Sequence, residues 1–408
     1  MCCNLLRRET FVNDRDVVIL STVRTAIGRL GGSLKDIPAQ DLGAIAVREA
    51  IKRAGIDASE VGEVIMGQSR QTTEASNIAR VVALKAGIPE EASAYTVHRQ
   101  CASSLQAFVN GCQEIMTGCS DVVVTGGTEV LSRAPFYLKN ARYGYGNGNG
   151  ALVDALTEAG PGAQPVEIYG NLPMGLTAEN VAEEFNISRE DQDSFALMSQ
   201  QRAASAISEG RYKAQITPVE VKAGRGTAVF DTDEHPRATT LEKLGSLPGS
   251  FAKGGTVTAG NSCGFNDAAG ALVLSSASRA RSLGITPLAK VVSWSAVGVA
   301  PRIMGIGPIP ATLKALERAG IRLDDIGMIE LNEAFASQVL ASIRKLNLSL
   351  DRINPNGGAI ALGHPIGATG AVLLTKLVYG MIDGNHRYGL TTLCIGGGQG
   401  MAVILEKV

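Results

Sequence analysis

Two patterns of apolar residues alternate along the chain, one typical of buried strands and the other typical of amphipathic helices. Residues 16–25 are rich in β-branched side chains and are predicted to form a buried strand, with Arg24 at its exit. From Asp41, the expected N-cap, apolar residues recur at helical spacing as far as Gly55, the expected end of the helix. A second strand is predicted over residues 61–68. Alternation of this kind predicts parallel βαβ units and an α/β fold.

The same pattern occurs twice in the sequence. The segment Ala50–Gly67 resembles Ala315–Asn332, and the matching alanine, isoleucine and glycine residues are all separated by one constant offset. The same offset places a copy of the opening strand near Leu288–Gly298. A repeat of this length predicts two similar α/β halves, related by a pseudo-dyad.

A long segment between the two copies differs from both of them. It contains a glycine run over residues 143–150 and a helical pattern over residues 177–208. Insertions with their own helices are more typical of binding elements than of linkers. We therefore predict three parts: a first half formed by residues 1–130 with about 264–286, an inserted loop domain over 131–263, and a second half over 287–408.

The charge balance argues against some classes of partner. The formal net charge is −1, so no overall field favours nucleic acid or an anionic membrane. The apolar run at 371–382 is interrupted by Lys376, and no stretch approaches the roughly 20 residues that cross a bilayer. Residues 1–11 have no apolar core segment and are interpreted as an untargeted tail. We expect no nucleic-acid partner and no membrane insertion.

The cysteines are odd in number and widely scattered. There are seven of them, without a secretory segment, which indicates free thiols in a reducing compartment and predicts a cytoplasmic protein. No CxxC pair and no clustered His/Cys spacing suggests zinc, so no metal is expected.

Cys101 lies at a predicted helix start. From Leu105 to Met116 the apolar residues recur at three- and four-residue steps, so Cys101 is predicted to begin a buried amphipathic helix. The free N–H groups and partial positive charge of a helix start stabilise a thiolate. The alternative interpretation is a buried structural cysteine near a helix start.

Three further polar groups follow strand ends or lie in glycine loops. His364 lies in the glycine-rich segment 356–370, where the alternative is a turn histidine with a structural hydrogen bond. Cys394 ends a β-rich run before the loop GGGQG, which lacks the Lys-Ser/Thr of a phosphate loop. Asn332 follows a predicted strand. Because ligand crevices of open α/β sheets lie beyond the carboxyl ends of strands, these groups and Cys101 are expected to converge on one rim.

At these residues the sequence resembles the thiolase family, the acetyl-CoA acetyltransferases and 3-ketoacyl-CoA thiolases. The motifs GGAIALGHPIGATG and CIGGGQG are highly specific for that family, and the likeness covers almost the whole chain. It implies the thiolase fold, with duplicated βαβαβαββ halves in a five-layer αβαβα arrangement and an inserted loop domain that covers CoA.

The resemblance also implies an activity and its partners. The expected protein is an acyltransferase of fatty acid metabolism that catalyses reversible thiolytic cleavage and Claisen condensation of 3-ketoacyl-CoA. Acetoacetyl-CoA and CoA giving two acetyl-CoA, or a longer-chain equivalent, is the expected reaction. CoA and acyl-CoA thioesters would be substrates, with no tightly bound cofactor, and the protein would be a homo-oligomer, a homotetramer built as a dimer of dimers.

The resemblance assigns a role to each catalytic candidate. Cys101 would form an acyl-enzyme once His364 takes its proton. Cys394 would remove or return the proton at C2 of acetyl-CoA. One oxyanion would lie against His364 and a water held by Asn332, and the other against the backbone N–H groups of Cys101 and Gly396.

Contacts with CoA follow the same likeness. Met174 and Phe335 match positions that line the acyl and pantetheine tunnel, and Arg237 is a candidate for the nucleotide phosphates. Phe251, Ala259 and Cys263 lie where the family meets pantetheine. For each of these residues, plain packing or a solvated charge is the alternative.

The sequence departs from the family pattern at four positions. His98 replaces the usual Asn three residues before the nucleophile, and Ser104 replaces a usual Gly. Pro173 stands where short-chain enzymes commonly carry a His, and Cys263 replaces a serine. These changes leave the catalytic set intact but leave the acyl-chain length open.

Two other functions compete with a thiolase. A condensing enzyme of the ketoacyl-synthase type shares the fold and the helix-start cysteine but would not need Cys394. A non-enzymatic CoA-binding or scaffold protein is the other alternative, and the joint presence of Cys101, Asn332, His364 and Cys394 argues against it.

Overall fold

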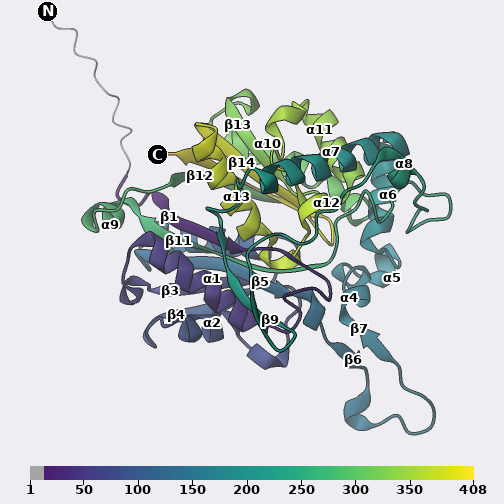
Figure 1. Cartoon of the computed structure of the whole chain (residues 1–408), viewed down its shortest axis with the longest axis horizontal. Helices are drawn as coiled ribbons and strands as arrows, with labels where there is room; N and C mark the ends of the chain where they lie inside the picture. Colours follow the sequence, from purple (N-terminus) through teal and green to yellow (C-terminus); the bar gives the residue numbers. More distant parts are fainter. Residues whose placement is uncertain (1–12) are drawn as a thin grey trace, which may run out of the picture.

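The computed structural model describes residues 13–408 and centres on one large mixed sheet (Figure 1). The expectation of an untargeted tail at residues 1–11, with Cys2 and Cys3, lies outside the described residues. The main sheet has the strand order β13-β14-β15-β12-β1-β11-β5-β3-β4, with β2 beside β11 and β8 beside β1. Its strands are β1 (Val17–Thr25), β2 (Gly28–Arg29), β3 (Glu63–Gly67), β4 (Ser93–Val97), β5 (Val122–Val130), β8 (Ile216–Thr217), β11 (Asn266–Ser276), β12 (Ala289–Gly298), β13 (Ile326–Leu331), β14 (Tyr388–Ile395) and β15 (Gln399–Lys407).

The strand order is the same in the two halves of the sheet. In β1-β11-β5-β3 the first two pairings are antiparallel and the third is parallel, and β12-β15-β14-β13 repeats that sequence of pairings. Beyond β3 lies the parallel strand β4, and beyond β13 a single parallel bridge joins Ile329 to Ile353. The halves meet where β1 and β12 pair antiparallel through Val18 and Ile19. The predicted duplication is therefore present.

Helices form three layers around and between these half-sheets. Outer helices α1 and α2 pack on the first half, α10 and α11 pack on the second, and α3 and α13 pack against each other between the halves. A side chain at Gly370 of α13 would put its Cβ 2.3 Å from the backbone nitrogen of Leu105 in α3, so these two helices approach closely. The expected αβαβα arrangement is confirmed, with helices α1 (Ala39–Ala54), α2 (Ile78–Ala86), α3 (Ser103–Thr117), α10 (Pro308–Ala319), α11 (Ala336–Leu346) and α13 (Thr369–Asp383).

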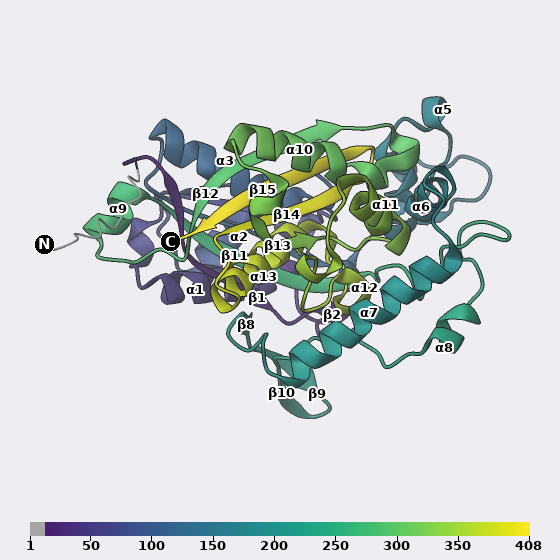
Figure 2. The same ribbon diagram turned by 90° about the horizontal axis from the view of Figure 1, so that it is seen from above.

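The segment between the halves carries the remaining elements. Figure 1 shows the β6–β7 hairpin standing away from the body of the molecule. Figure 2 shows α7 running along one side of that body, beside α8 and β9–β10. These elements are β6 (Phe136–Leu138), β7 (Leu152–Asp154), α4 (Ala155–Glu158), α5 (Val166–Tyr169), α6 (Met174–Glu184), α7 (Arg189–Ser208), β9 (Val219–Ala223), β10 (Gly226–Phe230) and α8 (Leu241–Gly245). Two short helices lie elsewhere, α9 (Ala277–Ser282) and α12 (Ala359–Leu362).

Two expected helix boundaries are wrong. The first helix begins at Ala39, directly after Pro38, so Asp41 lies in its first turn and is not the N-cap. Asp41 instead forms an ion pair of 2.7 Å with Lys85 of α2. The pattern over 177–208 is not one helix, because α6 ends at Glu184 and the Ser188 side chain accepts the Asp191 N–H to cap α7.

The apolar segment Ile366–Asp383 corrects the expectation about membrane spans. By length and composition it is apolar enough to cross a bilayer, and Lys376 does not interrupt its helix. However, 78% of the segment is buried inside the protein, as in the core helix of a globular domain. The Lys376 ammonium is buried with it and lies 2.7 Å from the Glu330 carboxylate.

Candidate active site

A cavity of about 480 Å³ lies at the ends of the central helices and strands. Cys101, His364, Cys394 and Gly396 all line it, although they come from both halves of the chain. Cys101 and His364 precede α3 and α13, the two helices that pack against each other in the central layer. The duplication therefore brings residues that are distant in sequence to one cavity.

Cys101 lies on a sharp turn before α3. The helix itself begins at Ser103, so Cys101 precedes the first turn and does not begin the helix as predicted. Gln100 has φ +45, an uncommon value for a residue with a side chain. The Ser103 hydroxyl holds this turn, because it accepts the Arg99 N–H at 2.9 Å and donates to the Gln100 carbonyl at 2.7 Å. The strained turn presents the thiol to the cavity.

The surroundings of Cys101 favour a neutral thiol at rest. Burial raises the pKa of Cys101, and this effect outweighs the lowering by the backbone N–H of Gly396 and by the Arg70 guanidinium. Backbone N–H groups lower the pKa of Cys101 in the expected direction, but burial outweighs them. A nearby base has to take the proton before the sulfur can attack.

His364 has the properties of that base. Its Nδ1 lies 2.7 Å from the Thr369 hydroxyl, and its Nε2 has no hydrogen-bond partner within residues 13–408. Burial, followed by the Arg70 charge, lowers the pKa of His364 to about 4, so the ring is neutral near pH 7. With Nδ1 donating to Thr369, the Nε2 lone pair is free to accept a proton.

Backbone geometry fixes the loop that carries His364. Gly363 has φ +106, a conformation that side chains disfavour, and a Cβ there would lie 2.4 Å from the Asn266 Oδ1. The same Asn266 oxygen accepts the backbone N–H of His364 at 3.0 Å. A short 3-10 turn, Ile366–Ala368, follows Pro365 and leads into α13.

Cys394 is a second thiol in the same cavity. It lies near the end of β14 and is almost fully buried. Burial raises the pKa of Cys394 well above its usual value, and the neighbouring Cys101 and Cys263 thiols raise it further. Burial also raises the pKa of Cys263 to about 12. Because negative charge on one of these sulfurs disfavours it on the others, Cys394 is held as a protonated thiol that can donate.

Asn332 is buried directly after β13 but does not line the cavity, unlike the other three catalytic candidates. Its backbone N–H donates to the Thr392 carbonyl, while its side-chain Oδ1 and Nδ2 have no partner within the described chain. The adjacent Glu333 carboxylate is fully engaged by Ser199, Asn354 and the Ile360 N–H. A buried amide with two free polar atoms calls for a hydrogen-bonding partner.

Four of the six predicted substrate contacts line the cavity. They are Met174, Phe251, Cys263 and Phe335. Phe251 and Phe335 meet edge to face with their ring centres 6.2 Å apart, and Phe251 is 42% exposed. This aromatic pair marks the open side of the cavity.

The other two predicted contacts, Arg237 and Ala259, are exposed and do not line the cavity. They lie together, since the Arg237 Nη2 donates to the Ala259 carbonyl at 2.9 Å. Of the departures from the family pattern, Pro173 lines the cavity and His98 is exposed. The Ser104 hydroxyl accepts the Ala371 N–H, so it joins α3 to α13.

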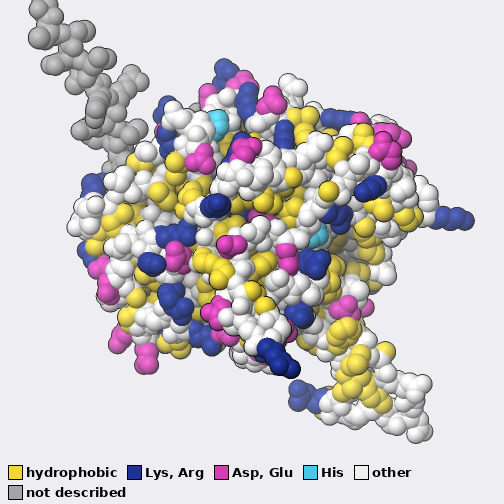
Figure 3. Space-filling view, in the orientation of Figure 1, with side chains coloured by type: hydrophobic (Ala, Val, Ile, Leu, Met, Phe, Trp, Pro, Cys, Tyr) yellow, Lys and Arg dark blue, Asp and Glu magenta, His cyan; other side chains and the backbone are white. Residues whose placement is uncertain are grey.

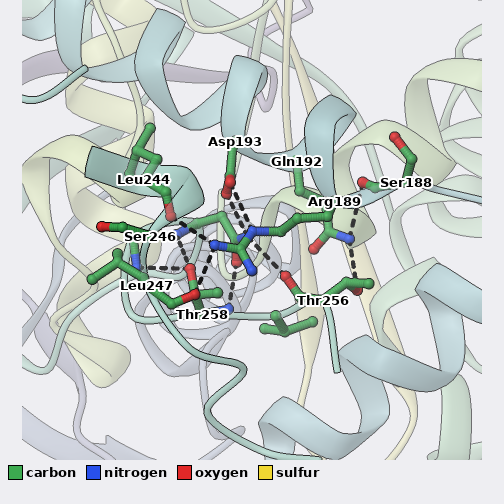
Figure 4. Close-up of polar contacts among 12 residues, drawn as sticks. Ser188, Arg189, Gln192, Asp193, Leu244, Ser246, Leu247, Thr256 and Thr258 are labelled. Atoms are coloured by element: carbon green, nitrogen blue, oxygen red, sulfur yellow. Dashed lines mark hydrogen bonds and ion pairs between the residues drawn. The ribbon is translucent and has the colours of Figure 1, made fainter. Parts of the chain in front are cut away.

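A buried polar network holds the segment that carries Cys263 (Figure 4). Arg189 pairs with Asp193 at 2.7 Å and donates to the carbonyls of Leu244 and Leu247, which ties α7 to α8. Gln192 donates to the Thr256 hydroxyl, and Asn261 donates to Asp193 at 2.9 Å. Because these bonds link both ends of the segment to α7, the wall beside Cys263 is held in place.

Several residues of the site are not marked by any local sequence pattern. Thr369 and Asn266 both hydrogen-bond to His364, the first to its ring and the second to its backbone N–H. Glu129 is buried and accepts four hydrogen bonds, from the backbone N–H and hydroxyl of Ser69 and from the N–H groups of Arg70 and Gly367. It therefore joins the loop after β3 to the loop after His364.

No group of His, Cys, Asp and Glu side chains that could hold a metal ion occurs within residues 13–408. The five described cysteines, Cys101, Cys112, Cys119, Cys263 and Cys394, are free thiols. The chemistry that this arrangement supports is acyl transfer through a thiol, with a neutral imidazole and a second thiol as proton-transfer groups.

Comparison with known proteins gives consistent matches over the whole length. The family models described as "Thiolase, N-terminal domain" and "Thiolase, C-terminal domain" match residues 17–278 and 285–407. An acetyl-CoA acetyltransferase of Syntrophomonas wolfei is 48% identical over 398 residues, 97% of this chain and 100% of that protein. The solved acetyl-CoA acetyltransferase of Bacillus anthracis is 43% identical with a TM-score of 0.93, covering 96% and 99%. Human mitochondrial 3-ketoacyl-CoA thiolase in complex with CoA is 42% identical with a TM-score of 0.92, covering 97% and 98%.

Proposed function

The chain belongs to the thiolase family and is an acyltransferase, and from that premise we propose which residues carry its reversible cleavage and condensation of 3-ketoacyl-CoA. The proposal rests on one observation, which is that Cys101, His364 and Cys394 line a single cavity. Each of the three has an environment that suits a different proton-transfer step.

In the first half-reaction of thiolysis, Cys101 attacks the C3 carbonyl of the 3-ketoacyl-CoA. The Nε2 of neutral His364 takes the thiol proton as the carbon–sulfur bond forms. The carbon–carbon bond then breaks and leaves an acyl-enzyme on Cys101 with the enolate of acetyl-CoA. Cys394, held protonated by burial, returns the proton to C2 of that enolate.

In the second half-reaction, the CoA thiol gives its proton to the Cys394 thiolate left by the first, and its sulfur attacks the acyl-enzyme. The bond from the acyl carbon to Cys101 breaks, and the released sulfur takes back the proton held by His364. The condensation direction reverses these steps, so Cys394 then has to accept the C2 proton of acetyl-CoA. The two thiols share one cavity, and a negative charge on either raises the pKa of the other. This coupling favours one sulfur anion at a time, and the two half-reactions use them in turn.

Two sites are proposed for the oxyanions. The backbone N–H groups of Cys101 and Gly396 would hold the oxygen of the tetrahedral intermediate on Cys101. The enolate oxygen would lie against His364, which donates once protonated, and against a water held by the free amide of Asn332. A water relay fits the burial of Asn332 outside the cavity lining.

We propose that the inserted segment 131–263 covers the bound CoA. Met174, Phe251, Cys263 and Phe335 would contact pantetheine, because they form the cavity wall next to its open side. The exposed Arg237, beside Ala259, would meet the nucleotide phosphates outside the cavity.

Assembly and location belong to the same proposal. The β6–β7 hairpin exposes Phe136, Tyr137, Leu138 and Leu152, and its apolar side chains gather at the lower right of Figure 3. An exposed apolar hairpin supports a homo-oligomer that buries it, and we propose a homotetramer. Free thiols in the described chain support a cytoplasmic location, and CoA thioesters of fatty acid metabolism are the proposed substrates.

The acyl-enzyme gives the direct test. Intact-protein mass spectrometry after incubation with acetyl-CoA should show one acetyl adduct on the wild type. It should show no acetyl adduct on Cys101→Ser, which lacks the thiol. Cys119→Ser, which removes an exposed thiol outside the cavity, is the matched control and should retain the adduct. An adduct on Cys101→Ser equal to that of the wild type would contradict the assignment.

A cleavage assay separates the thiolase from a one-way condensing enzyme. CoA-dependent loss of acetoacetyl-CoA, followed by its absorbance, is expected for the wild type. An enzyme that forms the acetyl adduct but never cleaves acetoacetyl-CoA would support the condensing enzyme instead.

A further inference from the structure

Arg70 is a charged residue in the wall of a mostly apolar cavity. It follows β3 and lines the cavity together with Gln100, Cys101 and His364. Its charge lowers the pKa of Cys101 and of His364, but the proposed steps assign no substrate contact to it. The free hydrogen-bonding capacity of this guanidinium therefore needs its own explanation.

Among the residues that the structure describes, no carboxylate pairs with the guanidinium of Arg70. Its Nη1 donates there to neutral oxygens, at 3.3 Å to the Ser69 carbonyl and hydroxyl and at 3.5 Å to the Gln100 Oε1. These distances are at the long end for hydrogen bonds. Its Nε is buried and has no partner within residues 13–408.

A structural arginine of the same chain has very different surroundings. Arg24 is fully buried, and both of its terminal nitrogens bind the Asp233 carboxylate, at 2.8 and 2.9 Å. That geometry satisfies a buried cation. Arg70 lacks it, although a carboxylate is close by, because Glu129 is engaged by the backbone N–H of Arg70 and three other donors.

The backbone of Arg70 is nevertheless held firmly. The Glu129 carboxylate accepts the Arg70 N–H at 3.0 Å and the Gly367 N–H at 2.8 Å. The cation thus projects from a fixed base that is linked to the loop carrying His364. A pre-organised guanidinium loses little conformational entropy when it binds a planar anion.

Arg70 lines the cavity wall together with the nucleophile. Its Nη1 reaches the Gln100 Oε1, and the Gln100 side chain lies near the oxyanion glycine, Gly396, as do Met174 and Ala163. The pantetheine side is marked by Phe251 and Phe335, which lie by the open face. An acyl chain that leaves the Cys101 sulfur on the side away from this aromatic pair would reach Arg70.

We propose that Arg70 determines substrate specificity by binding a carboxylate at the far end of the acyl chain. This inference rests on the proposed thiolase function and names its substrate class, the 3-ketoacyl-CoA thioesters of dicarboxylic acids. Thiolysis of such a substrate by CoA breaks the bond between C2 and C3. It releases acetyl-CoA and transfers the remaining acyl group, with its terminal carboxylate unchanged, first to Cys101 and then to CoA.

The test compares two thioesters of equal chain length, 3-oxoadipyl-CoA with a terminal carboxylate and 3-oxohexanoyl-CoA without one. The readout is the ratio of their kcat/KM values, so a general loss of activity cancels. In the wild type the charged substrate should be favoured by about tenfold or more. Arg70→Met should lower the ratio by about tenfold or more, and Arg70→Lys should lie between, because an ammonium binds a carboxylate without the bidentate geometry.

Arg99→Met is the matched control. It removes a positive charge two residues from Cys101, but Arg99 donates to Gln106 and does not line the cavity. The ratio should be the same in this variant as in the wild type. Equal losses on both substrates in Arg70→Met would mean that Arg70 only tunes the catalytic groups, and this would overturn the proposal.

A binding measurement makes the test independent of turnover. Calorimetry on full-length Cys101→Ser, which cannot form the thioester, with succinyl-CoA and butyryl-CoA, the corresponding shortened thioesters, should give tighter binding of the charged one. That preference should shrink when Arg70→Met is added and at high salt. If Cys101→Ser binds both equally, the specificity proposal fails even when the wild type cleaves acetoacetyl-CoA; if acetoacetyl-CoA is not cleaved, the proposed function fails and this binding ratio still decides the role of Arg70.

Discussion

The imidazole Nδ1 of His364 and the hydroxyl of Thr369 lie 2.7 Å apart at the start of the central helix α13. In the tautomer whose Nδ1 donates to this hydroxyl, Nε2 is the acceptor in the cavity. Thr369→Ala should therefore lower kcat/KM for acetoacetyl-CoA thiolysis by about tenfold, the value of one hydrogen bond. Thr369→Ser, which keeps the hydroxyl, should restore most of the loss.

Steady-state kinetics on the two Thr369 variants checks this prediction. Circular dichroism of each variant controls for folding, since Thr369 is buried at a helix start. If Thr369→Ala and Thr369→Ser lose activity equally, the hydroxyl does not orient the ring.

The buried imidazole also predicts how stability depends on pH. The pKa of His364 falls from 6.5 to about 4 in the folded protein, so the unfolded chain binds more protons between these values. The free energy of unfolding should therefore decrease as the pH falls from about 6.5 toward 4, by up to about 1.4 kcal/mol per pH unit from this group. Above pH 6.5 the contribution should be constant.

Urea unfolding at several pH values measures that slope. His235, whose pKa is also lowered to about 4, adds a slope of the same sign in the wild type. His364→Asn should remove only the contribution of His364 to this slope. The free energy of unfolding of the variant should therefore decrease less steeply with falling pH than that of the wild type. An unchanged slope in His364→Asn would show that the imidazole is not buried as a neutral ring.

Substitution of Cys394 should slow proton transfer at C2 of acetyl-CoA more than acyl-enzyme formation on Cys101. Cys394→Ala should slow the exchange of the C2 protons of acetyl-CoA with deuterium by about a hundredfold or more, since it removes the proposed acid and base. Acetyl-enzyme formation on Cys101 should fall much less. Nuclear magnetic resonance follows the exchange and mass spectrometry follows the adduct; parallel losses in both would argue against the assignment.

The buried ion pair between Lys376 and Glu330 makes a stability prediction. Both side chains are at most 2% exposed, and the ammonium also donates to the Gly357 carbonyl at 2.7 Å. Lys376→Met should lower the free energy of unfolding by about 3–5 kcal/mol, because it leaves a buried carboxylate without a partner. Adding Glu330→Gln should recover part of that loss, as measured by denaturant unfolding.

The sequence carried enough information for two similar α/β halves, because apolar periodicity and an internal repeat are properties of the chain itself, while the layered arrangement followed from the family resemblance. Cys101, His364 and Cys394 could be brought together for the same reason, since helix starts and strand ends of a duplicated sheet meet at one place. Asp41 shows the limit. Its residue type fits an N-cap, but Pro38 starts the helix earlier, and tertiary contact with Lys85 decides its role.

The finer parts of the site depend on geometry that no local pattern encodes. The positive φ of Gln100 depends on hydrogen bonds made by Ser103 after the turn has formed. Arg70 lies in a polar stretch that reads as an ordinary surface loop, yet Glu129, far away in sequence, fixes its backbone beside the nucleophile. Asn332 was expected on the same rim as Cys101, His364 and Cys394, but it is buried and does not line the cavity.

The duplication also determines how sensitive the activity is to a loss of packing between the two halves. Cys101 is supplied by one copy of the repeat and His364 and Cys394 by the other, while Ser104 and Ala371 are hydrogen-bonded across the joint between them. Catalytic activity therefore depends on how closely the two halves stay packed against each other. Heat or denaturant that slightly loosens the packing between the halves should abolish activity before the sheet of either half unfolds.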